Sequence, residues 1–151
     1  MSDRIEQEVE LRAPIARVWR ALTDHREFGT WFRVELEQPF AVGATARGRI
    51  TYPGFEHVVW QAVVQRIDAA AHVFSFTWHP YSIDPAVDYS QEPPTLVEFR
   101  LAASATGTRL TVTESGFDRV PAARRGEAFL RHQGGWATQM NNVRAHVEPA
   151  P

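Results

Sequence analysis

The end of the chain carries the feature that most constrains its fold, a single long amphipathic helix that follows a series of strands. At about 100° per residue, six side chains fall on one narrow stripe. These are Phe129, His132, Trp136, Met140, Val143 and Val147. A stripe of this kind has to be buried against another layer. Because only short helices are predicted elsewhere, we expect a sheet to cover it.

Strand patterns fill most of the chain before that helix. Residues 3–12 alternate, with Ile5, Val9 and Leu11 on one parity and glutamates on the other, which is typical of a half-buried strand. Further segments rich in β-branched and aromatic residues predict antiparallel strands at 34–40, 44–52, 57–68, 72–79, 95–103 and 109–117. The parity of segment 57–68 is ambiguous and leaves the direction of Trp60 open.

Two short helices are predicted between the first two strands. Pro14 suits the first turn of a helix over 15–22, and Thr23 or Asp24 can cap a second helix over 25–32. Residues 80–94 contain four prolines and no periodicity, which predicts a long surface loop. The order of elements indicates an α+β fold that forms one domain over residues 1–151.

Composition excludes several classes of function. The chain has no cysteine, and all sixteen of its basic residues are arginine, so thiol, disulfide and Schiff-base chemistry are absent. With a net charge of −2 and a single adjacent arginine pair, we expect no nucleic-acid partner. The six histidines lack metal-site spacing, and we expect no metal and no cofactor.

Location follows from two further observations. The apolar runs are too short to span a bilayer, and the first eleven residues lack the basic and apolar regions of a signal peptide. We therefore expect a cytoplasmic protein with no membrane partner.

Two polar residues are predicted to face the interior. Leu110 and Val112 set an inward parity that continues to Glu114, and His132 is the polar member of the helical stripe. Two interpretations stay open. The pair is either a structural pin between the last strand and the last helix, or a functional pair with perturbed titration.

The aromatic content favours a ligand site. Five tryptophans and nine phenylalanines on a small sheet covered by one helix predict an incompletely filled interior, with a fully packed core as the alternative. The candidate ligand-binding residues are Trp31, Phe76, Trp78, Phe99, Glu114, Phe117, His132, Trp136 and Met140.

Two adjacent glycines interrupt the long helix, each at a cost of about 1 kcal/mol relative to alanine. In the projection Gly134 lies opposite the buried stripe, and Gly135 lies on its flank, where it allows a neighbouring element to approach. We expect neither glycine to bind a ligand and assign both a mechanical role.

Several segments carry a resemblance to a known family. "APIARVWRALTDHREFGTWF", "VFSFTW", "TLVEFRL", "GTRLTVTESGFD" and "GGWATQMNNVRAHV" resemble, in order and spacing, bacterial proteins related to the C-terminal domain of the activator of Hsp90 ATPase. That family belongs to the START-like (SRPBCC) superfamily. The resemblance implies a helix-grip, or Bet v 1-like, fold in which a curved antiparallel sheet of six to seven strands wraps the C-terminal helix around an apolar cavity.

The resemblance and the residues together leave three functions open. The first is binding of a small hydrophobic ligand, such as a lipid, polyketide or aromatic compound, by a monomer or homodimer. The second is a protein-interaction role, including regulation of an Hsp90-type chaperone. The third is cyclase or hydratase chemistry, in which His132 is the acid or base and Glu114 its partner. We expect the first.

Overall fold

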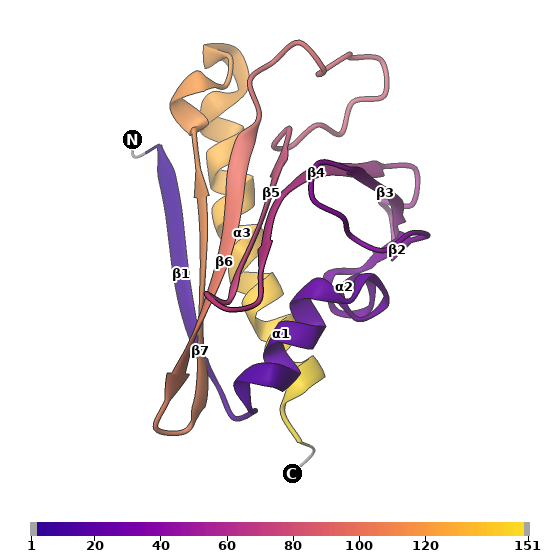
Figure 1. Cartoon of the computed structure of the whole chain (residues 1–151). Coiled ribbons are helices and arrows are strands. Elements are labelled where there is room, and N and C mark those ends of the chain that lie inside the picture. Colours follow the sequence, from indigo (N-terminus) through magenta and orange to yellow (C-terminus); the bar gives the residue numbers. More distant parts are fainter. Residues whose placement is uncertain (1–2, 150–151) are drawn as a thin grey trace.

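In the computed structural model, which describes residues 3–149, the chain forms one seven-stranded sheet, three α-helices and one short 3₁₀ helix (Figure 1). The elements in chain order are β1 (Arg4–Leu11), α1 (Ile15–Thr23), α2 (His25–Phe32), β2 (Val34–Leu36), β3 (Thr45–Ile50), β4 (Val59–Asp68), β5 (Val73–Trp78), β6 (Thr95–Ser104), β7 (Gly107–Ser115), η1 (Phe117–Arg119) and α3 (Ala122–Val147).

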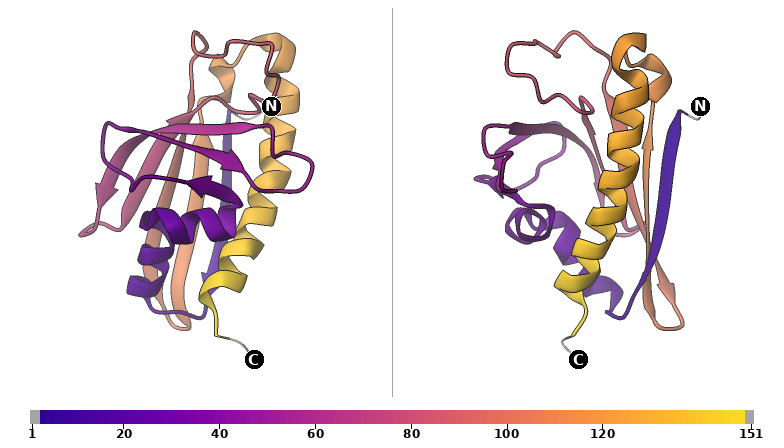
Figure 2. Two further views of the ribbon diagram at one scale, coloured as in Figure 1. Left: turned by 90° about the vertical axis from the view of Figure 1, so that its right-hand side faces the viewer. Right: turned by 180° about the vertical axis from the view of Figure 1, so that it is seen from behind.

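The sheet has the order β1-β7-β6-β5-β4-β3-β2, and every neighbouring pair is antiparallel. It curves so that α3 lies between its two ends, while α1 and α2 cover the lower part of the same face (Figure 2). The α+β helix-grip architecture expected from the element order and the family resemblance is confirmed.

Most strand ends lie within two residues of the predicted ones, and β2 differs by more. Alternation in β1 is confirmed, because Ile5, Val9 and Leu11 are buried. The strand predicted over 34–40 is wrong in length, since β2 pairs with β3 over only three residues. Pro39 lacks the N–H group that a continuing ladder would use.

The two short helices are joined by one capping residue. The Asp24 carboxylate accepts hydrogen bonds from the backbone N–H groups of Arg26 (2.9 Å) and Glu27 (3.2 Å), which caps α2. Gly29 lies where a Cβ atom would collide with the carbonyl oxygen of Val34. Glycine therefore lets α2 pack directly against the start of β2.

Aromatic side chains fill the space between the sheet and the helices. Phe28 of α2 is fully buried and touches six other rings at centroid distances of 4.9–6.4 Å. Those rings belong to Trp31, Phe32, Phe40, Trp60, Phe74 and Phe76. At this level the interior is a packed core.

The helical stripe faces the sheet as predicted, and all its members are buried except His132, whose side chain is 16% exposed. Both glycines are exposed, and a Cβ atom built at either would meet no neighbouring atom within 4 Å. The solvent-facing position predicted for Gly134 is confirmed. The close approach of another element at Gly135 is wrong.

Replacing Gly134 with alanine is expected to stabilise the fold by a few tenths to about 1 kcal/mol, because the added methyl group meets open space and the unfolded chain loses freedom. Urea unfolding followed by circular dichroism measures the change. A lower free energy of unfolding would show that this turn of α3 is not an ordinary exposed helical turn.

Candidate functional site

A fully buried carboxylate lies at the centre of the site. Glu114 projects from β7 toward α3, and each of its oxygens accepts two hydrogen bonds. Oε1 accepts from the indole Nε1 of Trp136 (2.9 Å) and from Nδ1 of His132 (2.6 Å). Oε2 accepts from Nε1 of Trp78 (2.7 Å) and from the hydroxyl of Thr95 (2.5 Å). The carboxylate thus fixes two indoles and the imidazole at once.

The hydrogen bonds of His132 define its tautomer. Its Nε2 accepts a hydrogen bond from the backbone N–H of Tyr81 at 3.0 Å, and that backbone group can only donate. Nε2 therefore carries no proton, and the proton sits on Nδ1, where it is donated to Glu114. The ring links β7, α3 and the loop after β5, and both of its nitrogens are used.

Two opposing effects set the titration of Glu114. Burial raises the pKa of this carboxyl, but the hydrogen bonds from His132, Thr95 and Trp78 outweigh it. The net result is a pKa below its ordinary value. Glu114 is therefore ionised near neutral pH even though it lies inside the protein.

A groove of about 610 Å³ opens beside this cluster, between β4, the loop after β5 and one flank of α3. Its aromatic lining includes Phe32, Trp60 and Trp78. Tyr52, Phe55 and Val59, three of the large hydrophobic side chains most exposed among residues 3–149, also line it. A smaller recess of about 110 Å³ beside it adds Trp136. The groove is an open, apolar hollow at the rim of the core.

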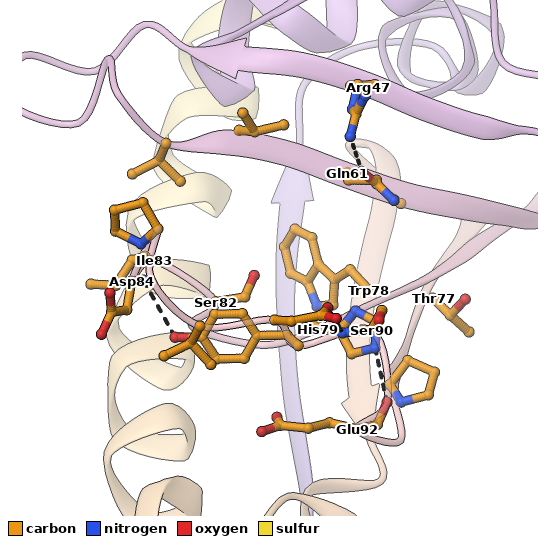
Figure 3. A pocket seen from close by; sticks show the side chains of 18 of the residues that line it. Arg47, Gln61, Thr77, Trp78, His79, Ser82, Ile83, Asp84, Ser90 and Glu92 are labelled. Carbon is orange, nitrogen blue, oxygen red and sulfur yellow. Dashed lines mark hydrogen bonds between the residues drawn. The ribbon is translucent and has the colours of Figure 1, made fainter.

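A second hollow of about 660 Å³ adjoins the groove and is more polar. Figure 3 shows Arg47 and Gln61 on β3 and β4, across this hollow from His79, Asp84 and Glu92 on the loop between β5 and β6. The two hollows share lining residues from β4 and from the loop. We call the first the inner groove and the second the outer hollow.

The loop of residues 79–94 walls both hollows and is tied to α3 at both of its ends. Arg124 donates to the carbonyl oxygen of Pro80 (2.7 Å) and to the carboxylate of Glu92 (2.6 Å). Nε2 of His79 also donates to the carbonyl oxygen of Glu92 (2.9 Å). The predicted surface loop is confirmed.

The structure divides the predicted ligand residues into two groups. Trp78 and His132 line the inner groove, and Trp136 lines its recess. The others are buried beneath it and line none of these hollows: Trp31, Phe76, Phe99, Glu114, Phe117 and Met140. Glu114 and His132 are brought together as expected, and every polar atom of both side chains is engaged.

Sequence reasoning missed several groove residues. The ambiguous parity of residues 57–68 left the direction of the Trp60 side chain undecided. In the structure this side chain faces the interior and is 6% exposed. Tyr52 and Phe55 lie around the turn between β3 and β4, where no periodicity marks a facing side. Gly135 lines the groove as well, whereas Gly134 does not.

Among residues 3–149 no helix is both long and apolar enough to cross a lipid bilayer. Over the same residues, no group of three or more histidine, aspartate or glutamate side chains is placed to hold a metal ion.

Comparison with known protein families shows the family to which the chain belongs. Residues 12–148 match the family model described as activator of Hsp90 ATPase homolog 1-like protein. This protein belongs to that family. A search of curated protein sequences gives no match.

Solved structures share the same fold. Protein MLL2253 from Mesorhizobium loti is 25% identical with a TM-score of 0.72, over 95% of each chain. The Aha1 protein of Colwellia psychrerythraea, whose solution structure is a dimer, is 16% identical with a TM-score of 0.70, over 96% of each chain. DynU16, from the dynemicin biosynthetic locus, is 23% identical with a TM-score of 0.73; the match covers 97% of this chain and 47% of DynU16.

Proposed function

We propose that this protein binds a small hydrophobic molecule, such as a lipid, polyketide or aromatic compound, in the inner groove. The observation that carries the proposal is the aromatic lining of the groove and its recess, where one buried carboxylate holds the indole of Trp78 in the groove and that of Trp136 in the recess. A site that fixes its contact surfaces before binding loses less conformational entropy when the ligand arrives.

The surface chemistry of the groove supports the proposal. Tyr52, Phe55 and Val59 keep 45–57% of their surface exposed while facing one hollow. Covering apolar surface yields about 25 cal/mol per Å². At the same wall, Nε1 of Trp60 is buried and has no hydrogen-bond partner among the described residues.

The helix glycines supply a matched pair of variants. Gly135→Leu places a large side chain into the groove without touching the core, whereas Gly134→Leu adds the same group to the same turn outside it. We expect the Gly135 variant to lower affinity for a bound fatty acid, flavonoid or polyketide about tenfold or more, a loss of about 1.4 kcal/mol. The Gly134 variant keeps wild-type affinity.

Tryptophan fluorescence during titration with a panel of these compounds measures the dissociation constants of the two variants. Both variants remove one glycine from a helix, so their stabilities should rise together. Equal affinity in the two variants, or no saturable response from any compound in wild-type protein, would contradict binding in the inner groove.

The geometry gives the Glu114–His132 pair a positioning role within this function. A catalytic base needs a free lone pair that faces the substrate. The Nε2 lone pair of His132 is occupied by the backbone N–H of Tyr81, and the four hydrogen bonds to Glu114 come from side chains of the protein. We therefore favour binding over cyclase or hydratase chemistry.

Regulation of an Hsp90-type chaperone is a second candidate, supported by the family to which the chain belongs. It predicts that the protein co-purifies with the bacterial Hsp90 homologue and raises its ATPase rate. Wild-type protein and the Gly135→Leu variant separate the two candidates, because chaperone stimulation that survives a blocked groove does not depend on groove binding.

A further inference from the structure

The first half of strand β4 extends beyond the end of its neighbour β5. It pairs with β3 along its first half, from Val59 to Val63, whereas its pairing with β5 starts only at Val63, opposite Thr77. After Trp78 the chain leaves the sheet and enters the loop. The segment from Val59 to Ala62 therefore lies inside the sheet order but has a strand on one side only.

The strand register shows which backbone N–H and C=O groups of β4 have no neighbouring strand to bond to. The N–H of Ile50 donates to the oxygen of Val58 (3.2 Å), and the N–H of Val64 donates to the oxygen of Ala44 (3.1 Å). In an antiparallel ladder alternate residues face opposite neighbours. The even residues of β4 therefore bond to β3, and the backbone groups of Val59 and Gln61 point away from β3.

On that side Val63 meets β5, but Val59 and Gln61 do not. No backbone hydrogen bond joins either residue to the loop within the part of the chain that the structure describes. Their N–H and C=O groups form a short open edge, two donors and two acceptors at the spacing of alternate strand residues. An open edge of this kind is a template for a further strand.

The two hollows lie along this open edge, and they differ in chemistry. Val59 and Gln61 line both the inner groove and the outer hollow. Aromatic rings line the inner groove, whereas Arg47 and Thr77 line only the outer hollow (Figure 3). A strand beside β4 would place alternate side chains toward the two faces of the sheet, one apolar and one polar.

The outer hollow carries charges of both signs. The carboxylates of Asp84 and Asp88 line it and accept backbone N–H groups of their own loop, and Glu92 is held by Arg124. On the opposite wall, Arg47 donates to the amide oxygen of Gln61. A neutral polar side chain on the incoming strand can hydrogen-bond to either wall, whereas an acidic one would face two further carboxylates.

We infer that the open edge of β4 binds an extended peptide segment of a partner protein, in which apolar residues alternate with neutral polar ones. The peptide adds a short strand at Val59 and Gln61, puts its apolar side chains into the inner groove and its polar side chains into the outer hollow. The peptide site does not require a small-molecule ligand, although the two ligands compete for the inner groove.

Amide hydrogen exchange tests the edge before any ligand is added. In wild-type protein the amides of Val59 and Gln61 should exchange about tenfold or more faster than those of Trp60 and Ala62, which bond to β3. Equal protection of all four amides would overturn the inference, because the edge would then be closed. Protection of Val59 and Gln61 that grows with protein concentration would assign the edge to a second copy and overturn it as well.

A blocked seven-residue peptide of alternating valine and threonine is the probe for binding. We expect saturable binding that protects the amides of Val59 and Gln61 from exchange. Two N-methylated forms serve as controls, one modified at the valine amides and the other at the threonine amides. Only one set can face β4, so one form should lose binding and the other keep it. An equal effect of both would contradict strand addition.

Val59 provides the matching protein variants. Its N–H faces the open edge, and proline is tolerated at the first residue of a strand, so Val59→Pro removes one donor without removing a bond to β3. We expect about a 5- to 10-fold loss of peptide affinity relative to Val59→Ala, which keeps the donor. Equal affinities of the two variants would overturn the inference.

A fatty acid or flavonoid that binds while the peptide does not would leave the proposed function intact and reject only the peptide site. Peptide binding without any response to these compounds would support the peptide site and reject the proposed small-molecule binding.

Discussion

Replacing Glu114 with glutamine is expected to cost about 3 kcal/mol or more of folding free energy. The carboxylate accepts four hydrogen bonds, from His132, Trp136, Trp78 and Thr95. An amide of the same shape keeps one acceptor oxygen and turns an NH₂ group toward two donors. Buried donors left without an acceptor cost about 1–3 kcal/mol each, and breaking a buried charged network costs about 3–5 kcal/mol.

Urea unfolding at pH 7 measures the loss, and Glu98→Gln on β6 is its control. The Glu98 carboxylate bonds to Arg100 at 2.7 Å, a partner that is 56% exposed, and such surface pairs contribute about 0–1 kcal/mol. A loss for Glu114→Gln no larger than that for Glu98→Gln would show that the buried network does not hold the site together.

The same variant carries a pH signature. The pKa of Glu114 is lowered in the folded protein, so its ionised form stabilises the fold at pH values above the unfolded pKa of about 4.3. This contribution is lost as pH falls from there through the lower folded pKa. The stability difference between wild-type protein and Glu114→Gln should therefore shrink as pH drops below about 4.5. A difference that stays constant into acid would contradict an ionised Glu114.

Replacing Phe28 with alanine is expected to cost about 3–5 kcal/mol, the range for removing a fully buried aromatic side chain. Its ring is 0% exposed and lies 4.9 Å from the rings of both Trp31 and Phe32. The cavity left behind cannot collapse easily, because its walls are rings held by α2 and by the sheet. Thermal and urea unfolding of the variant measure the loss.

Phe55→Ala is the control for size and chemistry, since the same atoms are removed from a side chain that is 45% exposed on the turn before β4. Its expected cost is below about 1 kcal/mol. Similar losses at the two positions would mean that the ring cluster around Phe28 is not the packed core described above.

Local periodicity predicted the order of elements and the packing of a sheet on the last helix, whereas the curved helix-grip architecture came from the family resemblance. The alternation of β1, the stripe on α3 and the proline-rich stretch before β6 each signal one element, and the inward parity of β7 placed Glu114 against His132. The structure added what parity cannot show. It paired the carboxylate with Trp78 and Trp136, because those contacts depend on how far the curved sheet closes on α3.

The groove was less predictable, for a physical reason. A repeat identifies the buried face of a strand or helix, and those residues fill the core. Groove residues lie where regular structure stops: Tyr52 and Phe55 lie around a turn, and Val59 is on the exposed face of β4. The position at which β5 leaves β4 is also set by tertiary geometry, so no local pattern marks the open edge.

The most direct test of ligand binding in the groove is an NMR titration of the five tryptophan indole N–H signals with fatty acids, flavonoids and polyketides. Trp60 and Trp78 line the inner groove. Trp31 lies in the core, and Trp19 of α1 packs against His72, which precedes β5. We expect saturable shifts at Trp60 and Trp78, with the signals of Trp19 and Trp31 unchanged. Shifts centred on Trp31, or no saturable shift with any compound, would contradict it.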